Sequence, residues 1–549
     1  ERNNMSKVVK EQIKEMIKSA LNELYIKFDP ENIVVEVPKK REQGDFSTNI
    51  AMQLTKVLKD NPRNIAEKIV EVLSKNTNEI KTIEIAGPGF INIYLNDEYV
   101  FSGISNVIKQ GENYGSSSIG KKEKVDIEFV SANPTGILHL GTARGAAYGS
   151  NLANIMSFAG YDVTKEYYIN DAGNQIINLG VSLKERYKGL CGLEENMPED
   201  GYYGSEIIDI AKTIFDKYGN SKLDEDLEFF KKVAVDYLLN IIKTDLSNFG
   251  VTFDVWTSEK SIRAKGRIEE SLKILDEKGL VYKKDNATWL KTTVYGDDKD
   301  RVLIKTDGSY TYLVPDIAYH LDKFDRGFDY LVDVFGADHH SYVSRLKASI
   351  EALGYDNDKL EVRLLQMVRL LRDGEIVKMS KRTGGNITIS ELVGEIGKDA
   401  ARYFFATRSL DGQMDFDINL ALKKSSENPF FYVGYANARI CSILKDAKEK
   451  NIDICTDIKE AIDIDSKALL LKVYEFTEVL ASAALKKEPH LITNYVYELA
   501  SMFHNYYGKH KILTDDIKMS EKRLGLIKTV GITITNALRL IGVKAPEKM

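Results

Sequence analysis

The segment 131–142, which reads SANPTGILHLGT, places a histidine between glycines at a point where the predicted secondary structure changes. Alternating apolar residues at 125–129 predict a strand before it, and a run of small residues predicts a helix from about residue 141. Helix N-terminal amides attract anions, Gly141 permits close approach of a ligand, and His139 can donate a ring N–H to a phosphate oxygen. The segment predicts a phosphate site, although a short histidine motif also arises by chance.

A second candidate lies far downstream, where residues 377–382 read VKMSKR and Gly384 and Gly385 follow. Two lysines beside glycines describe a cationic loop that could close over a triphosphate. Taken alone, the same loop is equally well a solvated turn. The presence of both segments in one chain, the first within a strand–helix–strand unit, favours a nucleotide-binding enzyme.

These two segments are similar to the H-x-G-H and K-M-S-K-S signatures of class I aminoacyl-tRNA synthetases. Longer strings resemble one family of that class, the arginyl-tRNA synthetases, over nearly the whole chain. They are GDFSTN (44–49), IAGPGFIN (85–92), EFVSANPTG (128–136), YYINDAGNQ (167–175), DIAYH (316–320), GADHH (336–340), YVGYANARI (432–440) and GVKAP (542–546). The resemblance implies an enzyme that activates L-arginine with ATP and transfers it through an arginyl-adenylate to tRNA(Arg).

The resemblance implies catalytic roles for His139, Lys378 and Lys381, which would stabilise charge on the phosphates. The implied ATP-binding residues are His139, Gly141, Thr142, Lys378, Met379, Ser380 and Lys381. Because the attacking arginine carboxylate is already ionised at pH 7, the reaction needs positioning and charge neutralisation rather than a general base. Mg²⁺ would accompany ATP, held mainly by phosphates and water.

Two positions depart from the signatures. Thr142 replaces the second histidine, and Arg382 replaces the serine after the lysine loop. A threonine can donate one hydrogen bond to a phosphate oxygen but carries no charge, which places more of the phosphate chemistry on His139 and the lysines.

The substrate arginine requires a second set of groups, because a planar guanidinium keeps its charge when buried and demands carboxylates. By resemblance these are Glu128 and Asp316, with Tyr312 packed on the guanidinium plane and with Asn133 and His339 at the α-amino and carboxylate end. For Glu128 the alternative is an exposed edge residue, and for Tyr312 it is simple core.

Two further groups of polar residues have alternative interpretations. The neighbouring His339 and His340 suggest a metal site at first sight, but no third ligand stands at metal spacing, which favours a substrate-pocket or hydrogen-bonding role. Polar residues that follow the second predicted strand could line the pocket or cap a turn; they are Asn170, Asp171, Asn174 and Gln175.

Contacts with tRNA are implied at both ends of the chain. Phe90 and Asn92, near Tyr94, are candidates for holding an unpaired loop base, because RNA is read through splayed bases on aromatic rings. Near the C-terminus the candidates are Tyr432, Tyr435 and Arg439, with Asn437 beside them and an aromatic–basic cluster at 503–511. Tyrosines at helical spacing are more often core than RNA platform, so both interpretations stay open.

The elements that must position these residues predict a multidomain α/β protein. It comprises an N-terminal α+β domain, a Rossmann-type parallel-sheet catalytic domain with helical insertions, and a C-terminal α-helical domain, which the resemblance implies is an anticodon-binding domain. The predicted boundaries are 1–117 for the first domain, 118–390 for the catalytic domain with insertions at about 175–275, 391–425 for a connecting segment, and 426–549 for the helical domain. The resemblance implies that the first domain is an additional tRNA-binding domain and that the connecting segment contacts the tRNA stem.

Individual strands follow from apolar alternation and turn signals. In the first domain a helix is expected near residues 9–24, with strands at 33–37, 83–86 and 90–95 and a Gly-Pro-Gly turn at 87–89. In the catalytic domain the expected sheet strands are 125–129, 163–169, 301–305, 330–335 and 362–367.

Composition bounds the class of protein. At 549 residues the chain is long enough for several domains, and no apolar run approaches the roughly 20 residues of a membrane span. Three widely spaced cysteines without a C-x-x-C pair argue against disulfides and structural zinc, and the region around Met5 lacks a secretory signal; both fit a cytoplasmic protein, which we expect to be monomeric. The net charge of −6 alone would disfavour RNA binding, but a large enzyme can segregate a basic groove.

Two other functions compete with this prediction. Another class I synthetase, for glutamine or cysteine, would share the nucleotide signatures but should lack two carboxylates facing an aromatic. A noncatalytic RNA-binding paralogue should have lost His139 or the lysine loop, and both are present.

Overall fold

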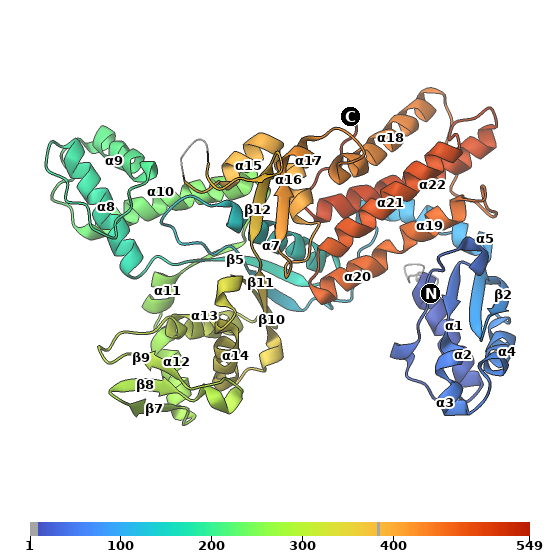
Figure 1. Cartoon of the computed structure of the whole chain (residues 1–549), viewed down its shortest axis with the longest axis horizontal. Helices are drawn as coiled ribbons and strands as arrows, with labels where there is room; N and C mark the ends of the chain where they lie inside the picture. Colours follow the sequence, from blue (N-terminus) through green and yellow to red (C-terminus); the bar gives the residue numbers. More distant parts are fainter. Residues whose placement is uncertain (1–8, 381–384) are drawn as a thin grey trace.

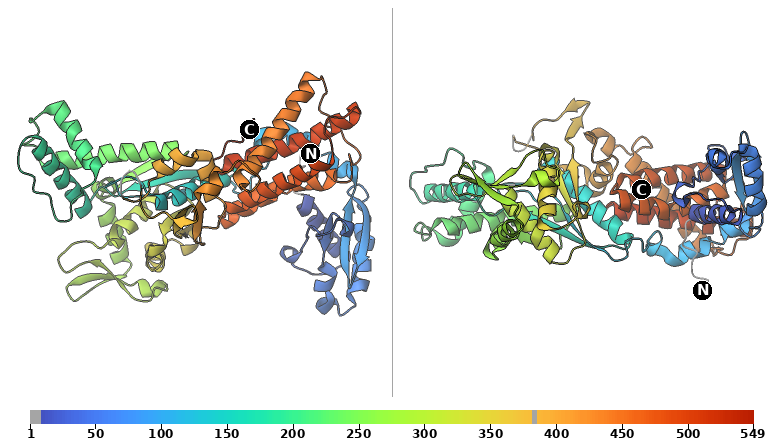
Figure 2. Two further views of the ribbon diagram at one scale, coloured as in Figure 1. Left: turned by 45° about the horizontal axis from the view of Figure 1, so that its top comes forward. Right: turned by 90° about the horizontal axis from the view of Figure 1, so that it is seen from below.

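The computed structural model describes residues 9–380 and 385–549, which form an elongated molecule with three parts (Figure 1). The parallel sheet and its insertions occupy one end, a bundle of long helices extends from it, and the N-terminal domain lies against the far end of that bundle (Figures 1 and 2). No helix among the described residues is long and apolar enough to cross a membrane. The predicted fold class is confirmed.

The N-terminal domain packs helices on one small antiparallel sheet of order β1-β3-β2. Its elements are α1 (Val9–Glu23), β1 (Phe46–Thr48), α2 (Ile50–Gln53), α3 (Thr55–Leu58), α4 (Pro62–Leu73), β2 (Ile80–Ala86) and β3 (Phe90–Leu95). The Gly-Pro-Gly turn joins β2 to β3 as predicted, with Ala86 opposite Phe90. The strand predicted at 33–37 is reduced to one bridge between Glu36 and Ser47, because its partner β1 is only three residues long.

Two short helices, α5 (Asp97–Phe101) and α6 (Ile104–Gln110), lead from this domain along the helical bundle. They are followed by Tyr114, which is buried and whose hydroxyl donates to the main-chain oxygen of Val473 at 2.6 Å.

The catalytic sheet has five parallel strands in the order β11-β10-β4-β5-β6. The strands are β4 (Lys124–Glu128), β5 (Asp162–Ile169), β6 (Val255–Ser258), β10 (Tyr330–Gly336) and β11 (Leu360–Leu365). The chain first moves from β4 to β5 and β6 on one side and then returns to β10 on the other side of β4. The carboxyl ends of β4 and β10 therefore mark the point where a doubly wound sheet binds its ligand.

Helix α7 (Leu140–Phe158) makes the first crossover and is almost wholly buried. Its small residues are required by close packing: a Cβ added at Gly149 would lie 2.1 Å from the ring of Phe129. The glycine lets the helix rest directly on the end of β4, which fixes where the helix N-terminus meets the sheet.

Two insertions interrupt the sheet. The first, between β5 and β6, contains α8 (Asn174–Leu190), α9 (Ser205–Tyr218) and α10 (Leu227–Asn248) around an apolar cluster of their own. The second, between β6 and β10, contains α11 (Glu259–Ala264), α12 (Arg267–Glu277), β7 (Val281–Lys284), β8 (Ala287–Leu290), β9 (Arg301–Ile304) and α13 (Leu313–Asp325).

Two sequence assignments in this region were wrong. Residues 301–304 form β9, which pairs antiparallel with β8 in a separate three-stranded sheet, and not a strand of the catalytic sheet. The missing fifth strand is β6, which lies inside the range 175–275 predicted as an insertion. It escaped detection because it has only four half-buried residues, whereas strands buried on both faces read as apolar runs.

The rest of the catalytic region follows β10. It contains α14 (Tyr342–Leu353), β12 (Val368–Arg372), β13 (Glu375–Ile376), α15 (Ile389–Ile396), α16 (Lys398–Phe405), β14 (Met414–Asp417) and α17 (Ile418–Leu422). Short 3₁₀ turns occur at Pro30–Asn32, Arg41–Gln43, Gly111–Asn113, Thr292–Tyr295, Ala337–His339 and Asn357–Lys359. The helical bundle comprises α18 (Pro429–Glu449), α19 (Ser466–Tyr474), α20 (Phe476–Lys486), α21 (His490–Lys509) and α22 (Ile517–Leu540).

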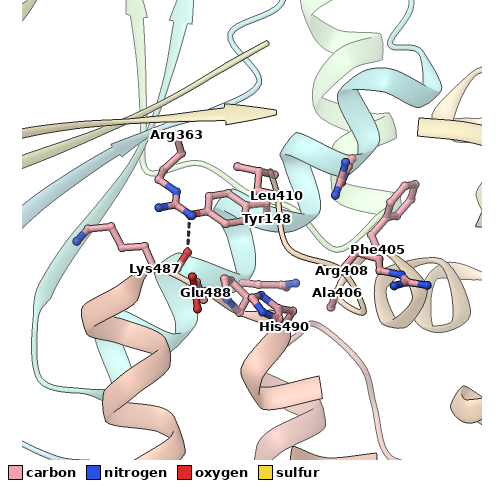
Figure 3. A pocket seen from close by; sticks show the side chains of 12 residues that line it. Tyr148, Arg363, Phe405, Ala406, Arg408, Leu410, Lys487, Glu488 and His490 are labelled. Atoms are coloured by element: carbon pink, nitrogen blue, oxygen red, sulfur yellow. Dashed lines mark hydrogen bonds between the residues drawn. The ribbon is translucent and has the colours of Figure 1, made fainter. Parts of the chain in front are cut away.

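Helix α7 also joins the sheet to the bundle. The Tyr148 hydroxyl donates to the main-chain oxygen of Lys487 at 2.8 Å, beside Arg363 and His490 (Figure 3). The cavity that these residues line measures about 10 Å³, which is room for roughly one water molecule. This junction is therefore a packed interface rather than a ligand pocket.

Candidate active site

The predicted phosphate segment forms the N-terminus of α7. His139 is the N-cap residue, with an extended backbone (φ −97°, ψ 169°) and an exposed side chain. A Cβ placed on Gly141 would meet no heavy atom of residues 9–380 or 385–549 within 4 Å, so these residues leave the space beside the glycine open. The helix N-terminus thus presents an exposed imidazole and a backbone that the described residues leave uncovered on one side, as an anion site requires.

Thr142 is oriented differently from the sequence expectation. Its hydroxyl donates to the main-chain oxygen of His139 at 2.6 Å. Because a threonine hydroxyl has one proton, this contact leaves none for a phosphate oxygen in this arrangement. Thr142 therefore fixes the backbone that carries His139.

The segment that follows the lysine loop lies against the same helix N-terminus. The amide of Leu140 donates to the oxygen of Ile387 (2.9 Å), and the amide of Ile389 donates to the oxygen of Leu138 (3.2 Å). This short ladder brings together two signatures that lie far apart in the sequence. It places the segment after the lysine loop beside His139.

Within the loop, Lys378 and Met379 are exposed, whereas Ser380 is buried. The Ser380 hydroxyl donates to Glu391 Oε1 at 2.6 Å, and Thr388 caps the same helix by accepting from the Glu391 amide. Ser380 therefore anchors the loop to α15. Lys381 lies outside the described residues.

The carboxyl end of β4 turns sharply through two left-handed residues, Val130 (φ 67°) and Ser131 (φ 42°). This conformation is strained for a β-branched valine, and such strain is typical of functional sites. The turn lets Ser131 Oγ donate to Glu128 Oε2 (3.0 Å) and accept from the amide of Tyr168 (3.1 Å). Glu128 Oε1 accepts from Lys323 Nζ at 2.8 Å. Glu128 is thus a buried, clamped carboxylate and not an exposed edge residue.

Asp316 occupies the first turn of α13 and accepts a hydrogen bond from the Tyr342 hydroxyl. Burial raises the pKa of Asp316 to about 6, the Tyr342 hydrogen bond opposes that rise, and the negative charge of Glu128 adds to it. The two predicted guanidinium ligands therefore share one electrostatic environment, although they come from a strand and from a helix of the second insertion.

The other predicted arginine-site residues lie on the surface. Tyr312 precedes α13 and is 85% exposed, so it is not simple core. Asn133 donates to Gln175 Oε1 at 2.7 Å, and the exposed His339 follows β10, with its ring 6.0 Å from that of Phe335. No group of three or more His, Cys, Asp or Glu side chains within residues 9–380 and 385–549 is placed to hold a metal ion.

The polar residues of the turn after β5 were expected either to line the pocket or to cap a turn. Asp171 accepts from the Lys260 amide at 3.0 Å and from the Ser258 hydroxyl, so it caps the start of α11. Gln175 instead faces Asn133. The capping interpretation therefore applies to Asp171, and a pocket-lining role for Gln175 stays a prediction.

Comparisons with known proteins match this arrangement along the whole chain. The arginyl tRNA synthetase N-terminal domain matches residues 11–95, the class I (R) tRNA synthetase catalytic domain matches 103–411, and the DALR anticodon binding domain matches 433–549. The arginine–tRNA ligase of Bacillus subtilis is 51% identical over 100% of both chains, and that of Geobacillus thermodenitrificans is 50% identical over 98% of this chain and 99% of its own. The chain belongs to the arginyl-tRNA synthetase family.

Solved structures agree with this family assignment. A Campylobacter jejuni chain is 35% identical with a TM-score of 0.76, covering 82% of this chain and 99% of that one. The Thermus thermophilus arginyl-tRNA synthetase, at 20% identity, shares the fold with a TM-score of 0.78 over 98% of this chain and 100% of its own.

For an arginyl-tRNA synthetase, the surface formed by α18 and α21 is the candidate anticodon face. The Arg439 guanidinium lies 4.6 Å from the ring of Tyr435 and 4.1 Å from that of Tyr507, and both tyrosines are partly exposed. Tyr432 lies 4.5 Å from the His504 ring. Phe503 and Tyr506, from the same predicted cluster, are buried core.

The two residues of the N-terminal domain that are predicted to contact tRNA, Phe90 and Asn92, differ in their exposure to solvent. Phe90 is 40% exposed at the start of β3, where a base could stack on it. Asn92 is only 5% exposed, and its Oδ1 accepts from the Ser47 hydroxyl at 2.8 Å. Direct contact between Asn92 and a nucleotide stays a prediction.

Sequence reasoning missed the groups that hold the two carboxylates, namely Ser131, Lys323 and Tyr342. One signal was available for Lys323: it follows Asp316 by seven residues and His320 by three, which places all three on one face of α13. Tyr342 gave no signal, because its contact with Asp316 joins two different helices.

Proposed function

We propose that this chain charges tRNA(Arg) with arginine and that the residues described above divide the work. The arginine carboxylate attacks the α-phosphorus of ATP, pyrophosphate leaves, and arginyl-adenylate remains. The 2′-hydroxyl of the terminal adenosine then attacks the arginyl carbonyl, and AMP leaves.

The observation that carries this proposal is the pair Glu128 and Asp316 at the carboxyl edge of the sheet, beside the anion-binding start of α7. A guanidinium presents five donors in a plane and suits carboxylates from two directions. Tyr312 closes over the guanidinium, with a cation–π attraction of roughly 0.5 to 2 kcal/mol, and Asn133 and His339 hold the α-amino and carboxylate end. Citrulline would leave a carboxylate unpaired, so the pair also provides discrimination.

At the phosphate end, His139 donates to phosphate oxygens and the open backbone at Gly141 admits ATP. Thr142 acts through the backbone of His139, and Met379 and Ser380 shape the lysine loop. Lys378 and Lys381 neutralise charge on the α-phosphate and the departing pyrophosphate. Mg²⁺ enters as part of the ATP substrate, held mainly by phosphates and water.

The tRNA is held at two places besides the active site. Phe90 and Asn92 receive a loop base at one end of the molecule, and Tyr432, Tyr435 and Arg439 receive anticodon bases on the helical bundle. We further propose that the enzyme is cytoplasmic and monomeric. Sedimentation at micromolar concentration tests the monomeric state.

The decisive assay incubates the protein with labelled arginine, ATP and tRNA and measures acid-precipitable arginyl-tRNA. Charging should require all three components and should collapse in His139→Ala, whose backbone is already fixed by Thr142. Labelled lysine and citrulline serve as substrate controls. Efficient charging of either, or no charging of arginine by the folded wild-type protein, would disprove the proposal.

A further inference from the structure

The inner face of α13 is polar, although it is packed against the sheet. Asp316, His320 and Lys323 recur at i, i+4 and i+7, where a buried helix normally presents apolar side chains. His320 and Lys323 are 2% and 0% exposed. Burying such groups is costly unless each one is paired, so their partners indicate what the stripe does.

Lys323 reaches three carboxylates. Its Nζ donates to Glu128 Oε1 at 2.8 Å and to Asp333 Oδ1 at 3.0 Å, and it lies 3.5 Å from Asp126 Oδ1. An ammonium has three protons; two of them are donated to Glu128 and Asp333, whereas Asp126 is an ion-pair neighbour without a hydrogen bond. The partners stand on β4 and β10, the two strands between which the chain reverses its direction across the sheet.

His320, and Arg326 at the end of α13, are also paired with the sheet, whereas Asp316 accepts from Tyr342 on α14. His320 Nε2 lies 2.5 Å from Asp333 Oδ2, and Arg326 donates to both oxygens of Glu166 on β5. Asp126 is different, because neither of its buried oxygens has a hydrogen-bond partner among the described residues. Its nearest cation is Lys323.

The cluster contains more acidic groups than cations. Among the described residues, Asp126, Glu128, Glu166, Asp316 and Asp333 lie around Lys323, Arg326 and His320, and Arg326 is shared with Asp322. Burial raises the pKa of Asp126 to about 8, so this group is largely protonated at pH 7, which leaves Glu128 and Asp316 as the acids proposed to meet the substrate at the carboxyl edge of the sheet. A positively charged side chain entering there would complete the charge balance, whereas a neutral one would not.

We propose that Lys323 is a positioning residue for arginine recognition: it holds one oxygen of Glu128, so that the carboxylate is aimed and charged before the guanidinium arrives. This inference rests on the proposed function. Ser131 holds the second oxygen from the opposite side, and lone pairs on both oxygens remain for the substrate.

The electrostatics of Glu128 support this role. Burial raises the pKa of Glu128, the charge of Lys323 is the largest opposing influence, and Asp333 adds to the rise. The other ionisable groups around the cluster are Asp316, His320, Asp322 and Arg326 on α13, Glu166 on β5, and Tyr319, Tyr342 and Arg345. Without Lys323, the largest influence that lowers the pKa of Glu128 is gone, and only the smaller effect of His320 and the Ser131 hydrogen bond would oppose burial and the neighbouring carboxylates.

The test compares Lys323→Met with Lys323→Arg in arginine-dependent aminoacylation at saturating tRNA, from pH 6 to pH 9. In Lys323→Met the KM for arginine should rise at least tenfold at pH 7, with the KM for ATP within twofold of wild type. Because more of Glu128 is protonated without its cation, the rise of kcat/KM for arginine should move to higher pH. Lys323→Arg should retain the wild-type pH profile.

Two controls separate positioning from stability. Lys273→Met removes an exposed lysine on α12 and should change neither KM nor the pH profile. Lys323→Met/Asp126→Asn removes the lysine together with the buried acid that has it as nearest cation. No buried acid is then left there without its cation, but Glu128 is still unsupported. This double variant should melt closer to wild type yet keep the raised arginine KM and the shifted pH profile.

A folded double variant with wild-type arginine KM and pH profile would overturn the inference. An equal decrease of kcat/KM for arginine and for ATP at every pH in Lys323→Met would overturn it as well. Failure of the wild-type protein to charge arginine would instead disprove the proposed function. The two failures are therefore distinguishable.

Discussion

Asp316 offers a direct test of the arginine site, because its removal should weaken catalysis and strengthen the fold. Asp316→Asn keeps the size of the side chain and an oxygen that can accept from Tyr342, but it removes the charge. The change affects the guanidinium directly, and the phosphate end at His139 is left intact.

The expected loss of function is large. Removing one partner of a desolvated, hydrogen-bonded charge pair costs about 2 to 5 kcal/mol, which corresponds to a loss of roughly 30- to 4,000-fold in kcat/KM for arginine. The KM for ATP should change by less than about threefold. The variant should discriminate less against citrulline than the wild type does, because an asparagine tolerates a neutral partner.

The expected gain in stability follows from the pKa. Burial raises the pKa of Asp316 from 3.8 to about 6, so the folded protein holds the ionised form less favourably than the unfolded chain does. The ionised carboxylate therefore destabilises the fold at neutral pH, by about 3 kcal/mol at most and less where solvent reaches the group. The cost falls as the pH drops from 7 toward 4, because protonation of the folded state then removes it.

Two measurements test this reasoning. Aminoacylation kinetics with labelled arginine give the loss of function, and thermal unfolding at pH 8 and pH 5 gives the stability. Asp316→Asn should melt above the wild type at pH 8, and the difference should shrink at pH 5. A variant that charges arginine within threefold of wild type, or that melts below wild type at pH 8, would refute the reasoning.

Three other predictions concern separate parts of the molecule. Thr142→Ala should lower kcat by less than about fivefold, because its hydroxyl serves the backbone, whereas His139→Ala should lower kcat roughly 100- to 1,000-fold; a large loss in the threonine variant would place its hydroxyl on a phosphate. Arg402→Met should destabilise the fold by at least about 3 kcal/mol, since the buried guanidinium donates to Phe249, Gly250, Ser150 and Asn151; unchanged chemical unfolding would contradict this role. Tyr435→Ala should raise the KM for tRNA roughly 5- to 100-fold at unchanged arginine KM, as measured by charging at varied tRNA; equal effects on both substrates would count against an RNA-binding face.

The sequence by itself determined the family and the order of the domains, and it named most of the residues that we propose to contact the substrates. These features are local: the H-L-G-T and K-M-S-K strings and the carboxylate-bearing strings around Glu128 and Asp316 are continuous segments. Strands with strong apolar alternation, such as β3 and β10, were also recognisable from the sequence. Each such signal depends on residues close together in the chain, so no knowledge of tertiary contacts was needed.

The tertiary structure decided which strands join the catalytic sheet and what holds the site residues. Strand β6 belongs to the sheet and β9 does not, because pairing depends on long-range neighbours rather than on four residues. Thr142 turns its hydroxyl to its own helix cap, and Asn92 is covered by Ser47.

The clamp on Glu128 is the clearest case of a feature that only the tertiary structure shows. Lys323 is 195 residues distant in sequence from Glu128, and it becomes its partner only because α13 packs on the sheet between β4 and β10. A buried charge is tolerable only with such a partner, and no local pattern names that partner. The sequence therefore identified the carboxylate, and the packing of α13 determined how it is held in the position where we propose that it meets the guanidinium.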